Sequence, residues 1–273
     1  MHKFNIQKII IYIFLLFIVI LTFYPVVWMF VTSFRLESSP FGKSLFESGS
    51  FGIKNYINSL NARPFLLYLF NSTFVALVSV IITIIVGACA GYSLAKFKYR
   101  LSNFFWIISL SSIMIPLEAI VIPLYLEINA FGWTNTYAGL ILPTAFNVVA
   151  IFIFRQSIKE VPDELIEASR IDGASELRIL FSVIMPVIIP TVIVVAVLTF
   201  TLSWNSYLWP LVVVSDDELR TLPLGMASYQ KSYGTRYTEL MAVSVYGAIP
   251  TLLFFIALQR YFIESAITTG IKG

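Results

Sequence analysis

Long apolar stretches separated by short polar segments dominate the chain. A helix needs about 20 mostly apolar residues to cross the hydrocarbon core of a bilayer. Six segments approach or exceed that length: 9–31, 72–95, 104–126, 137–154, 183–213 and 240–258. The pattern therefore predicts an all-α integral membrane protein with six transmembrane helices.

The fifth segment is the irregular one. No charged residue occurs between Arg178 and Asp216, a stretch too long for one straight span and too short for two spans with a turn. We expect one helix with apolar flanks, with Pro186 and Pro190 near its start and residues 204–210 near its end.

The first segment has the charge order of a secretory signal, because Lys3 and Lys8 precede it. Its apolar stretch is much longer than the roughly 7–15 residues of a signal core, and no small-residue cleavage site follows. We therefore expect a retained helix at 9–31, with Lys8 at its cytoplasmic end.

The distribution of Lys and Arg predicts the orientation. With the N-terminus inside, the basic residues are more numerous on the cytoplasmic side. Lys96, Lys98 and Arg100 crowd one short loop there, whereas the short outer loop at 127–136 has no basic residue. We expect both termini in the cytoplasm and a multi-pass protein of the cell membrane.

Composition narrows the possible functions. Only 12% of the residues are charged and 58% are hydrophobic, against about 25% charged in soluble domains. The net charge of +3 is not gathered into a basic block, so nucleic acid is not an expected partner. Cys89 and His2 are the only residues of their kinds, which argues against metal clusters and Ser-His or Cys-His catalysis. We expect no catalytic residue and no metal site.

The loop at 155–182, between the fourth and fifth segments, predicts a short helix over 162–172 outside the membrane. Pro162 suits the first helical position, Asp163 and Glu164 suit the positive end of the helix dipole, and Gly173 suits a left-handed stop. The loop could be an ordinary amphipathic connector on the lipid surface, although its acidic start counts against that reading.

The string EASRIDGASELRILFSVIMPVIIP in this loop resembles the EAA loop of ABC importer permeases. Ser169 stands where the family usually has Ala, and Met185 where it usually has Leu. The stretches NSTFVALVSVIITIIVGACAGYSLAKFKY, WNSYLWPLVV and LQRYFIESAITTGIKG are similar to other parts of the carbohydrate-uptake branch. The resemblance, to the smaller six-helix permease of maltose-type systems, covers nearly the whole chain and is weakest at 35–63.

The resemblance implies a type I ABC importer permease fold in a single domain, 1–273. This domain would have an added helix at 9–31, a permease core at about 70–262 and a cytoplasmic coupling loop at 155–182. The expected partners are a second related permease, an ATPase dimer, an extracellular substrate-binding protein and the lipid bilayer. The cargo would be a sugar, oligosaccharide or polyol. ATP and Mg would be held by the ATPase subunits, with no cofactor on this chain, which has no GxxxxGK[ST] phosphate loop.

Within the coupling loop, the resemblance implies that a short helix docks in a groove of the ATPase. Glu167 would pair with a basic residue there, and Ala168 and Ser169 would allow close approach. Asp172 and Gly173 would form the turn that follows. These five residues are the predicted ATPase-coupling site.

Polar residues inside the predicted spans are candidates for the translocation path. Glu118 is an acid within the third span, and such residues usually face the bundle interior or water. It could equally lie near the outer interface. Asn147 and Asn205 could line the path or simply hydrogen-bond between helices. The small residues around Gly87 and Gly91 are expected to allow close helix packing.

Rival functions need features that the sequence lacks. An ion-coupled secondary transporter would be expected to bury ionisable residues in several helices and often to show repeats, and only Glu118 qualifies here. A membrane-embedded enzyme would need clustered acids, His or Cys at one depth. An ABC permease for a non-carbohydrate solute stays open.

Overall fold

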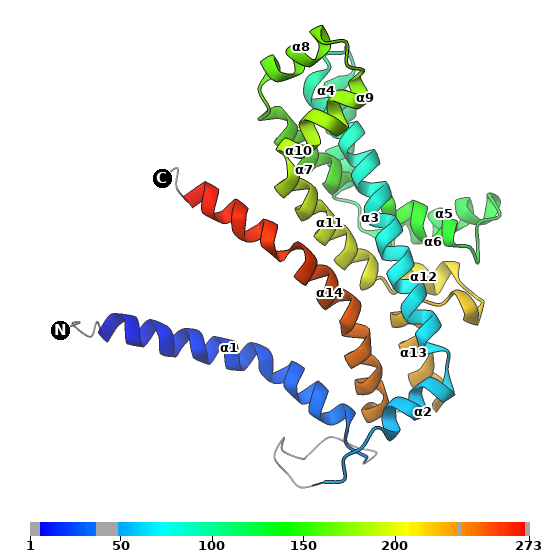
Figure 1. Cartoon of the computed structure of the whole chain (residues 1–273). Coiled ribbons are helices and arrows are strands. Elements are labelled where there is room, and N and C mark those ends of the chain that lie inside the picture. The colour runs from blue at the N-terminus through cyan, green and yellow to red at the C-terminus, as the bar shows by residue number, and fades with distance from the viewer. Residues whose placement is uncertain (1–5, 37–48, 234–235, 271–273) are drawn as a thin grey trace. The chain divides into compact units, whose positions relative to one another are not determined.

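The computed structural model describes residues 6–36, 49–233 and 236–270 (Figure 1). Within these ranges the secondary structure is helical, apart from an isolated antiparallel bridge between Arg35 and Phe51. Lys3 and Lys272, which contribute to the predicted orientation, lie outside the described residues. The chain divides into two compact units: Met1–Leu66 with Gly225–Ile249, and Leu67–Leu224 with Pro250–Gly273.

The first unit contains α1 (Ile6–Ser33), α2 (Lys54–Ala62), most of α13 (Leu222–Tyr233) and the first part of α14 (Tyr237–Gly270). Buried hydrogen bonds hold it together. Asn55 Nδ2 donates to the carbonyls of Ser33 and Arg35, at 2.9 and 2.6 Å. Glu239 is buried and accepts hydrogen bonds from Asn58 and Tyr229. These contacts connect the end of α1 to α2, and α2 to α13 and α14.

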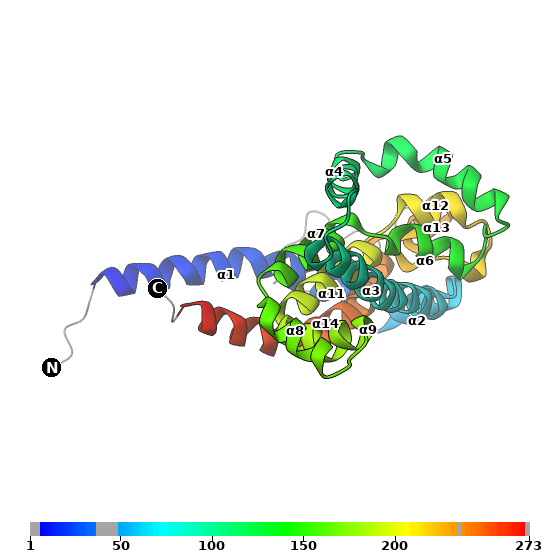
Figure 2. The same ribbon diagram turned by 90° about the horizontal axis from the view of Figure 1, so that it is seen from above.

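The second unit is built around α3 (Phe65–Lys96), a helix of 32 residues. The elements that follow are α4 (Ser102–Ser112), α5 (Leu117–Ala130), α6 (Tyr137–Ala145), α7 (Val148–Lys159), α8 (Asp163–Ile171), α9 (Glu176–Ile179), a π-helical turn (Leu180–Ile184), α10 (Met185–Val187), α11 (Ile189–Trp204), α12 (Leu208–Val213) and a 3₁₀ turn (Asp217–Leu219). Two views at right angles place α3, α7 and α11 side by side within this unit (Figures 1 and 2).

Among the described residues, three helices are long and apolar enough to cross a membrane: Ile10–Ser33, Phe65–Lys96 and Tyr237–Gln259. Three further segments pass only as bent pairs, which raises the number to six if each pair is one span. The bends are 108° between α4 and α5, 44° between α6 and α7, and 90° between Glu176–Val187 and Ile189–Trp204. All six lie over the apolar segments predicted from the sequence, but none of the three bends was predicted, and the fifth segment was expected to form one helix with apolar flanks.

Proline lies at two of the three breaks, and a further proline lies inside α6 before the third. Pro116 precedes α5, and Pro186 and Pro190 flank the bend at Ile188; proline removes a backbone donor and disfavours helix at the preceding residue. Pro143 within α6 leaves the carbonyl of Gly139 without its helical donor. The indole Nε1–H of Trp209 donates to that carbonyl instead, at 2.9 Å.

Two apolar clusters form the core of the second unit. One joins α3, α7, α8 and the segment from Ile179 to Val195; the other joins α3, α5, α6 and α12. Close packing of α3 on α7 requires glycine. A Cβ at Gly91 would lie 2.8 Å from Phe154 Cβ and 2.9 Å from the backbone nitrogen of Arg155, and one at Gly87 would lie 3.2 Å from the Phe154 ring. The predicted role of these small residues is confirmed.

Candidate functional site

The loop helix α8 spans Asp163–Ile171, one residue shorter at each end than the predicted 162–172. Pro162 is its N-cap rather than its first residue, and Asp172 is its C-cap. Gly173 has φ +79°, as its left-handed stop requires. The Gly173 N–H donates to the Arg170 carbonyl and the Ala174 N–H to the Ser169 carbonyl, both at 3.0 Å. This pair of bonds is the Schellman motif that ends a helix at glycine.

One side chain of α8, Ile166, is buried. Glu167 and Ala168 are exposed, and Ser169 is half-buried with its hydroxyl donating to the Leu165 carbonyl at 2.8 Å. Ile171 is 86% exposed. Ile171 was not singled out from the sequence, although an isoleucine at the end of a short polar helix was an available signal. The outward surface of the helix therefore includes two large apolar side chains, Leu165 and the more strongly exposed Ile171, together with the acid Glu167.

The first residue of α8 is bound to the end of α3. Lys96 Nζ lies 2.6 Å from Asp163 Oδ1 and 2.6 Å from the carbonyl oxygen of Val161. The Lys96 side chain is only 9% exposed, whereas that of Asp163 is 74% exposed. The hydrogen bond from Lys96 holds the pKa of the Asp163 carboxyl below its usual range, with a smaller contribution from the charge of Lys96.

The other end of α8 is also connected to α3. Arg170 Nε and Nη2 donate to the two carboxylate oxygens of Glu176, at 2.7 and 3.2 Å. The hydroxyl of Tyr92 on α3 donates to Glu176 Oε2 at 2.5 Å. The hydrogen bond to Glu176 raises the pKa of the Arg170 guanidinium. Glu176 thus joins the last turn of α8 to the last turns of α3.

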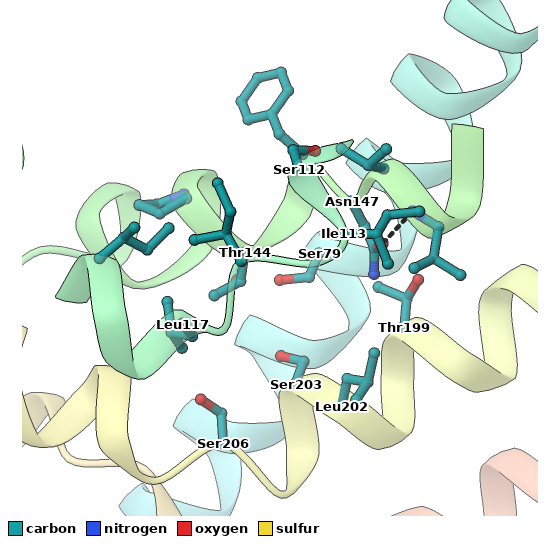
Figure 3. A pocket seen from close by; sticks show the side chains of 16 residues that line it. Ser79, Ser112, Ile113, Leu117, Thr144, Asn147, Thr199, Leu202, Ser203 and Ser206 are labelled. Carbon is teal, nitrogen blue, oxygen red and sulfur yellow. Dashed lines mark hydrogen bonds between the residues drawn. The ribbon is translucent and has the colours of Figure 1, made fainter. Parts of the chain in front are cut away.

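A second feature, a cavity of about 420 Å³, lies where the helices are broken (Figure 3). The turn between α4 and α5, the break between α6 and α7, α3, and the far end of α11 all contribute to its wall. Its polar lining residues carry hydroxyl or amide groups: Ser79, Ser112, Thr144, Asn147, Thr199, Ser203 and Ser206. No Lys, Arg, Asp or Glu is among the described residues that line it.

Ser79 stands out among these residues. Its hydroxyl is buried and has no hydrogen-bond partner among the described residues. In Figure 3 the hydroxyls of Ser79, Ser203 and Ser206 face the space bounded by Leu117 and Thr144. An unpaired buried hydroxyl is costly unless water or a ligand satisfies it. The wall of the cavity therefore includes one buried hydroxyl that has no hydrogen-bond partner among the described residues.

Of the three residues predicted for the translocation path, Asn147 lines the cavity and the other two do not. Asn147 lines the cavity and caps α7, its Oδ1 accepting from the Val149 N–H at 2.9 Å. Glu118 is exposed in the first turn of α5 and is not a lining residue, although its neighbour Leu117 is. Asn205 is exposed at the end of α11, with its amide bound to the Thr201 carbonyl at 3.0 Å. The structure does not bring the three together.

Sequence reasoning missed the hydroxyls that form most of the polar wall. Serine and threonine are frequent in apolar helices, where they bond to the preceding turn, so spacing alone does not reveal which of them face a cavity. Thr201, for example, donates to the Val197 carbonyl at 2.8 Å and is not a lining residue.

Comparison with known proteins gives the chain a family. Residues 83–263 match the family described as "Binding-protein-dependent transport system inner membrane component". The arabinooligosaccharides transport system permease protein AraQ of Halalkalibacterium halodurans is 33% identical over 261 residues, covering 94% of each chain. The sn-glycerol-3-phosphate transport system permease protein UgpE of Pectobacterium atrosepticum is 37% identical over 210 residues, 76% of this chain and 74% of UgpE.

A solved structure shows the same fold. A chain in the crystal structure of a bacterial ABC transporter involved in the import of the acidic polysaccharide alginate superposes with a TM-score of 0.81 at 21% identity. The match covers 96% of this chain and 98% of that chain. The resemblance inferred from the EAA-like string is confirmed, and with it a multi-pass membrane protein that serves transport. The chain belongs to the family of binding-protein-dependent transport system inner membrane components, the permease subunits of ABC importers.

Proposed function

We propose that the chain is one of two related permease subunits of an ATP-driven importer for a neutral sugar, oligosaccharide or polyol. It spans the cytoplasmic membrane six times, with both termini in the cytoplasm. It forms one domain, with a permease core at about 70–262, an added helix at 9–31 and a coupling loop at 155–182. The three long apolar helices and the three bent pairs support this topology.

The observation that carries the proposal is the form of α8. This helix buries a single side chain of its own, is fixed at both ends and turns its remaining surface outward. In the proposed complex it seats in a groove of an ATPase subunit. Ile171 fills an apolar part of the groove, and Glu167 pairs with a basic residue. Ala168 and Ser169 allow close approach, while Asp172 and Gly173 form the turn.

ATP and Mg bind to the two ATPase subunits in this proposal, and the chain itself holds no cofactor. Closure of the ATPase pair would move α8 as a rigid body and open the path for cargo. A substrate-binding protein delivers the cargo from outside. The segment at 215–239, which includes α13, is the proposed contact for that protein. Its first part is held by α3, where the amide of Asn71 donates to the carbonyls of Glu218 and Arg220, at 2.8 and 3.0 Å.

The cavity supports a neutral cargo. Irregular backbone at membrane depth is tolerated where it is buried in protein or lines a cavity, and broken helices mark binding sites in other transporters. The cavity volume lies within the range of about 300–1,000 Å³ typical of small-molecule pockets. UgpE is named for a phosphate-bearing solute and AraQ for oligosaccharides; the uncharged lining favours the second kind. In the proposed path Asn147 lies within the cavity, and Glu118 and Asn205 lie on the same path at its margins.

The coupling assignment is tested with the complex reconstituted in proteoliposomes, with its partner permease, ATPase and binding protein. Glu167→Lys should abolish cargo-stimulated ATP hydrolysis and transport while leaving membrane insertion intact. Glu160→Lys is the matched control, because Glu160 is an exposed acid of the same loop outside α8. Unchanged stimulated hydrolysis in the Glu167 variant would refute the assignment.

The topology is tested by labelling from one side. In a Cys89→Ser background, Ser169→Cys and Ser215→Cys should react with an impermeant maleimide from opposite sides of the membrane. Labelling of both from one side would refute the proposed orientation. A panel of neutral sugars, polyols and glycerol phosphates offered to the binding protein then decides the cargo class.

A further inference from the structure

We propose that Lys96 and Tyr92 of α3 are positioning residues for ATP coupling. They clamp the two ends of α8, so that α8, α3 and α7 move as one body and carry the movement of the ATPase to the cavity. This inference rests on the proposed docking role of α8, and it concerns residues outside the EAA-like string.

The need for a clamp follows from how α8 is attached to the chain. The covalent connection from α7 passes through residues 160–162, which lie between two separate helices. Pro162 in this link has no N–H to donate. A helix joined only by such a link could pivot when it is pushed. Contacts at both of its ends are required if a push on α8 is to move the rest of the unit.

The first clamp is at the start of α8. Lys96 buries its ammonium group and satisfies it with the Val161 carbonyl, in the link, and with Asp163, the first residue of the helix. An exposed ion pair alone contributes little. Here, however, the mostly buried ammonium would be left without these partners if the link moved away from α3, and an unpaired buried charge is strongly disfavoured.

The second clamp is at the end of α8. Glu176 accepts two hydrogen bonds from Arg170 in the last turn of α8 and one from Tyr92 of α3. Planar two-point pairs between Arg and a carboxylate fix orientation as well as distance. Tyr92 is itself buried, at 4% exposure, in the apolar cluster that includes Ile166 of α8. Its hydroxyl and its ring thus both connect α3 to the coupling region.

From the clamps, α3 runs unbroken to the cavity. Lys96 and Ser79 are separated by about 25 Å of helix at 1.5 Å per residue. On the way, Gly91 lets α3 pack directly against the backbone of α7, and Arg155 Nε of α7 donates to the Leu94 carbonyl at 3.2 Å. Thr83 Oγ1 donates to the Ala145 carbonyl at 2.8 Å, at the break between α6 and α7. A movement of α8 would therefore reach both Ser79 and that break.

The experiment uses the full reconstituted complex and two variants that remove polar groups with little change of shape. Tyr92→Phe removes one hydroxyl, and Lys96→Met removes one charge. The measured quantity is cargo transported per ATP hydrolysed, together with assembly and basal ATPase activity. Lys98→Met is the control, because Lys98 is exposed two residues beyond the clamp.

The clamp predicts a loss of coupling without a loss of assembly. Transport per ATP should fall about tenfold in Lys96→Met and about threefold in Tyr92→Phe, in line with the loss of a charged hydrogen bond. Basal hydrolysis and assembly should stay within about twofold of the wild type. In a double-mutant cycle, Tyr92→Phe combined with Glu176→Gln should be no worse than Glu176→Gln alone, since Glu176→Gln already weakens the bond from Tyr92 together with the pair to Arg170. Lys96→Arg should restore much of the lost coupling.

Two results would overturn the inference. One is wild-type transport per ATP in both Tyr92→Phe and Lys96→Met. The other is failure of both variants to assemble, which would make the residues structural. If Glu167→Lys abolishes stimulation while the clamp variants behave as wild type, the docking role of α8 stands and the clamp is wrong. If Glu167→Lys has no effect, the docking proposal itself has failed.

Discussion

The region around α8 and the cavity lie in the same unit, but their polar chemistry differs. Lys96, Asp163, Arg170 and Glu176 form two ion pairs around α8, with an apolar cluster beside them. Around the cavity the helices are broken, and the polar lining groups are hydroxyls and an amide. The paired charges around α8 make directional hydrogen bonds that favour one orientation of that helix. Neutral groups in the other can exchange their bonds with water or with a hydroxylated ligand at little cost.

The contrast extends to the helices. Near α8, the long unbroken α3 packs closely against α7 through Gly91. At the cavity the third and fourth apolar segments bend instead, which frees space and backbone groups. The unit thus combines a close α3–α7 contact near α8 with a cavity whose neutral lining groups can change their hydrogen-bond partners. The predictions that follow test whether the packing around α8 and the polar lining of the cavity can be changed separately.

The largest effect is expected from filling the α3–α7 contact. Gly91→Ala places a Cβ within 3 Å of Phe154 and of the Arg155 backbone, so the helices must separate at a cost of about 1–3 kcal/mol. The thermal unfolding midpoint of the detergent-solubilised complex should fall, and transport should fall with it. Gly52→Ala is the control, since its added Cβ would make only an ordinary 3.4 Å contact. An unchanged midpoint for Gly91→Ala would argue against this packing.

The next effect compares left-handed backbone at the end of α8 with left-handed backbone in the turn after α5. Gly173 and Gly132 both have positive φ, +79° and +70°, and an added Cβ at either meets nothing within 4 Å. Replacement of either by Ala should therefore cost about 1–2 kcal/mol from backbone strain alone. Thermal stability should fall similarly in both. Cargo-stimulated ATP hydrolysis should drop only in Gly173→Ala, because Gly132 lies in the turn after α5, away from α8 in the sequence. Equal losses of stimulated hydrolysis in the two variants would contradict a special role for the turn after α8.

A smaller effect is expected from changing the polar lining of the cavity. Ser79→Ala removes a hydroxyl that has no partner among the described residues, so stability should change by less than about 0.5 kcal/mol while the KM for cargo rises several-fold. Thr83→Val, about one turn away on α3, removes a buried hydrogen bond to the Ala145 carbonyl and should cost about 1 kcal/mol. Thermal midpoints and transport KM values measured on both variants show whether the Ser79 hydroxyl contributes to cargo binding or to stability. A destabilised Ser79 variant with unchanged KM would assign that hydroxyl a structural role.

The smallest effect is a dependence on pH at the first clamp. The pKa of Asp163 is lowered by Lys96, so its contribution is present above the unfolded pKa of about 3.9 and is lost only as the pH falls below that value. Spin labels at Ala168 and Tyr99, in a Cys89→Ser background, should give the same distance distribution from pH 8 to pH 5. The distribution should broaden only at lower pH. In Lys96→Met it should be broad at every pH, and a narrow distribution there would contradict the clamp.

Sequence patterns predicted the positions of the apolar segments and the place of α8 because both depend on local signals. An apolar run of sufficient length favours the membrane wherever it occurs. The stop at Gly173 follows from the low cost of left-handed backbone at glycine. The exact ends of α8 differed by one residue each, since capping depends on bonds that are decided only when the turn forms.

The positions of the helix breaks could not be predicted from the sequence, because proline occurs both at breaks and inside continuous helices. Pro25, Pro123 and Pro250 lie inside helices that continue, whereas helices break near Pro116 and between Pro186 and Pro190. Whether a helix survives a proline depends on whether neighbouring groups satisfy the freed carbonyls. Trp209, far along the chain, does this for Gly139 of α6. Such a partner is not a local property.

The sequence by itself determined that this protein is helical, apolar and built for a membrane, and that one short helix between the fourth and fifth apolar segments carries a family-like motif. Those features arise from composition and near neighbours. Only the tertiary structure decided which hydroxyls share the cavity and which charges hold α8. Lys96 and Asp163 are 67 positions apart, and Tyr92 and Glu176 are 84 apart. Pairings at such separations depend on how α3, α7 and the segment after α8 pack around their common apolar cluster.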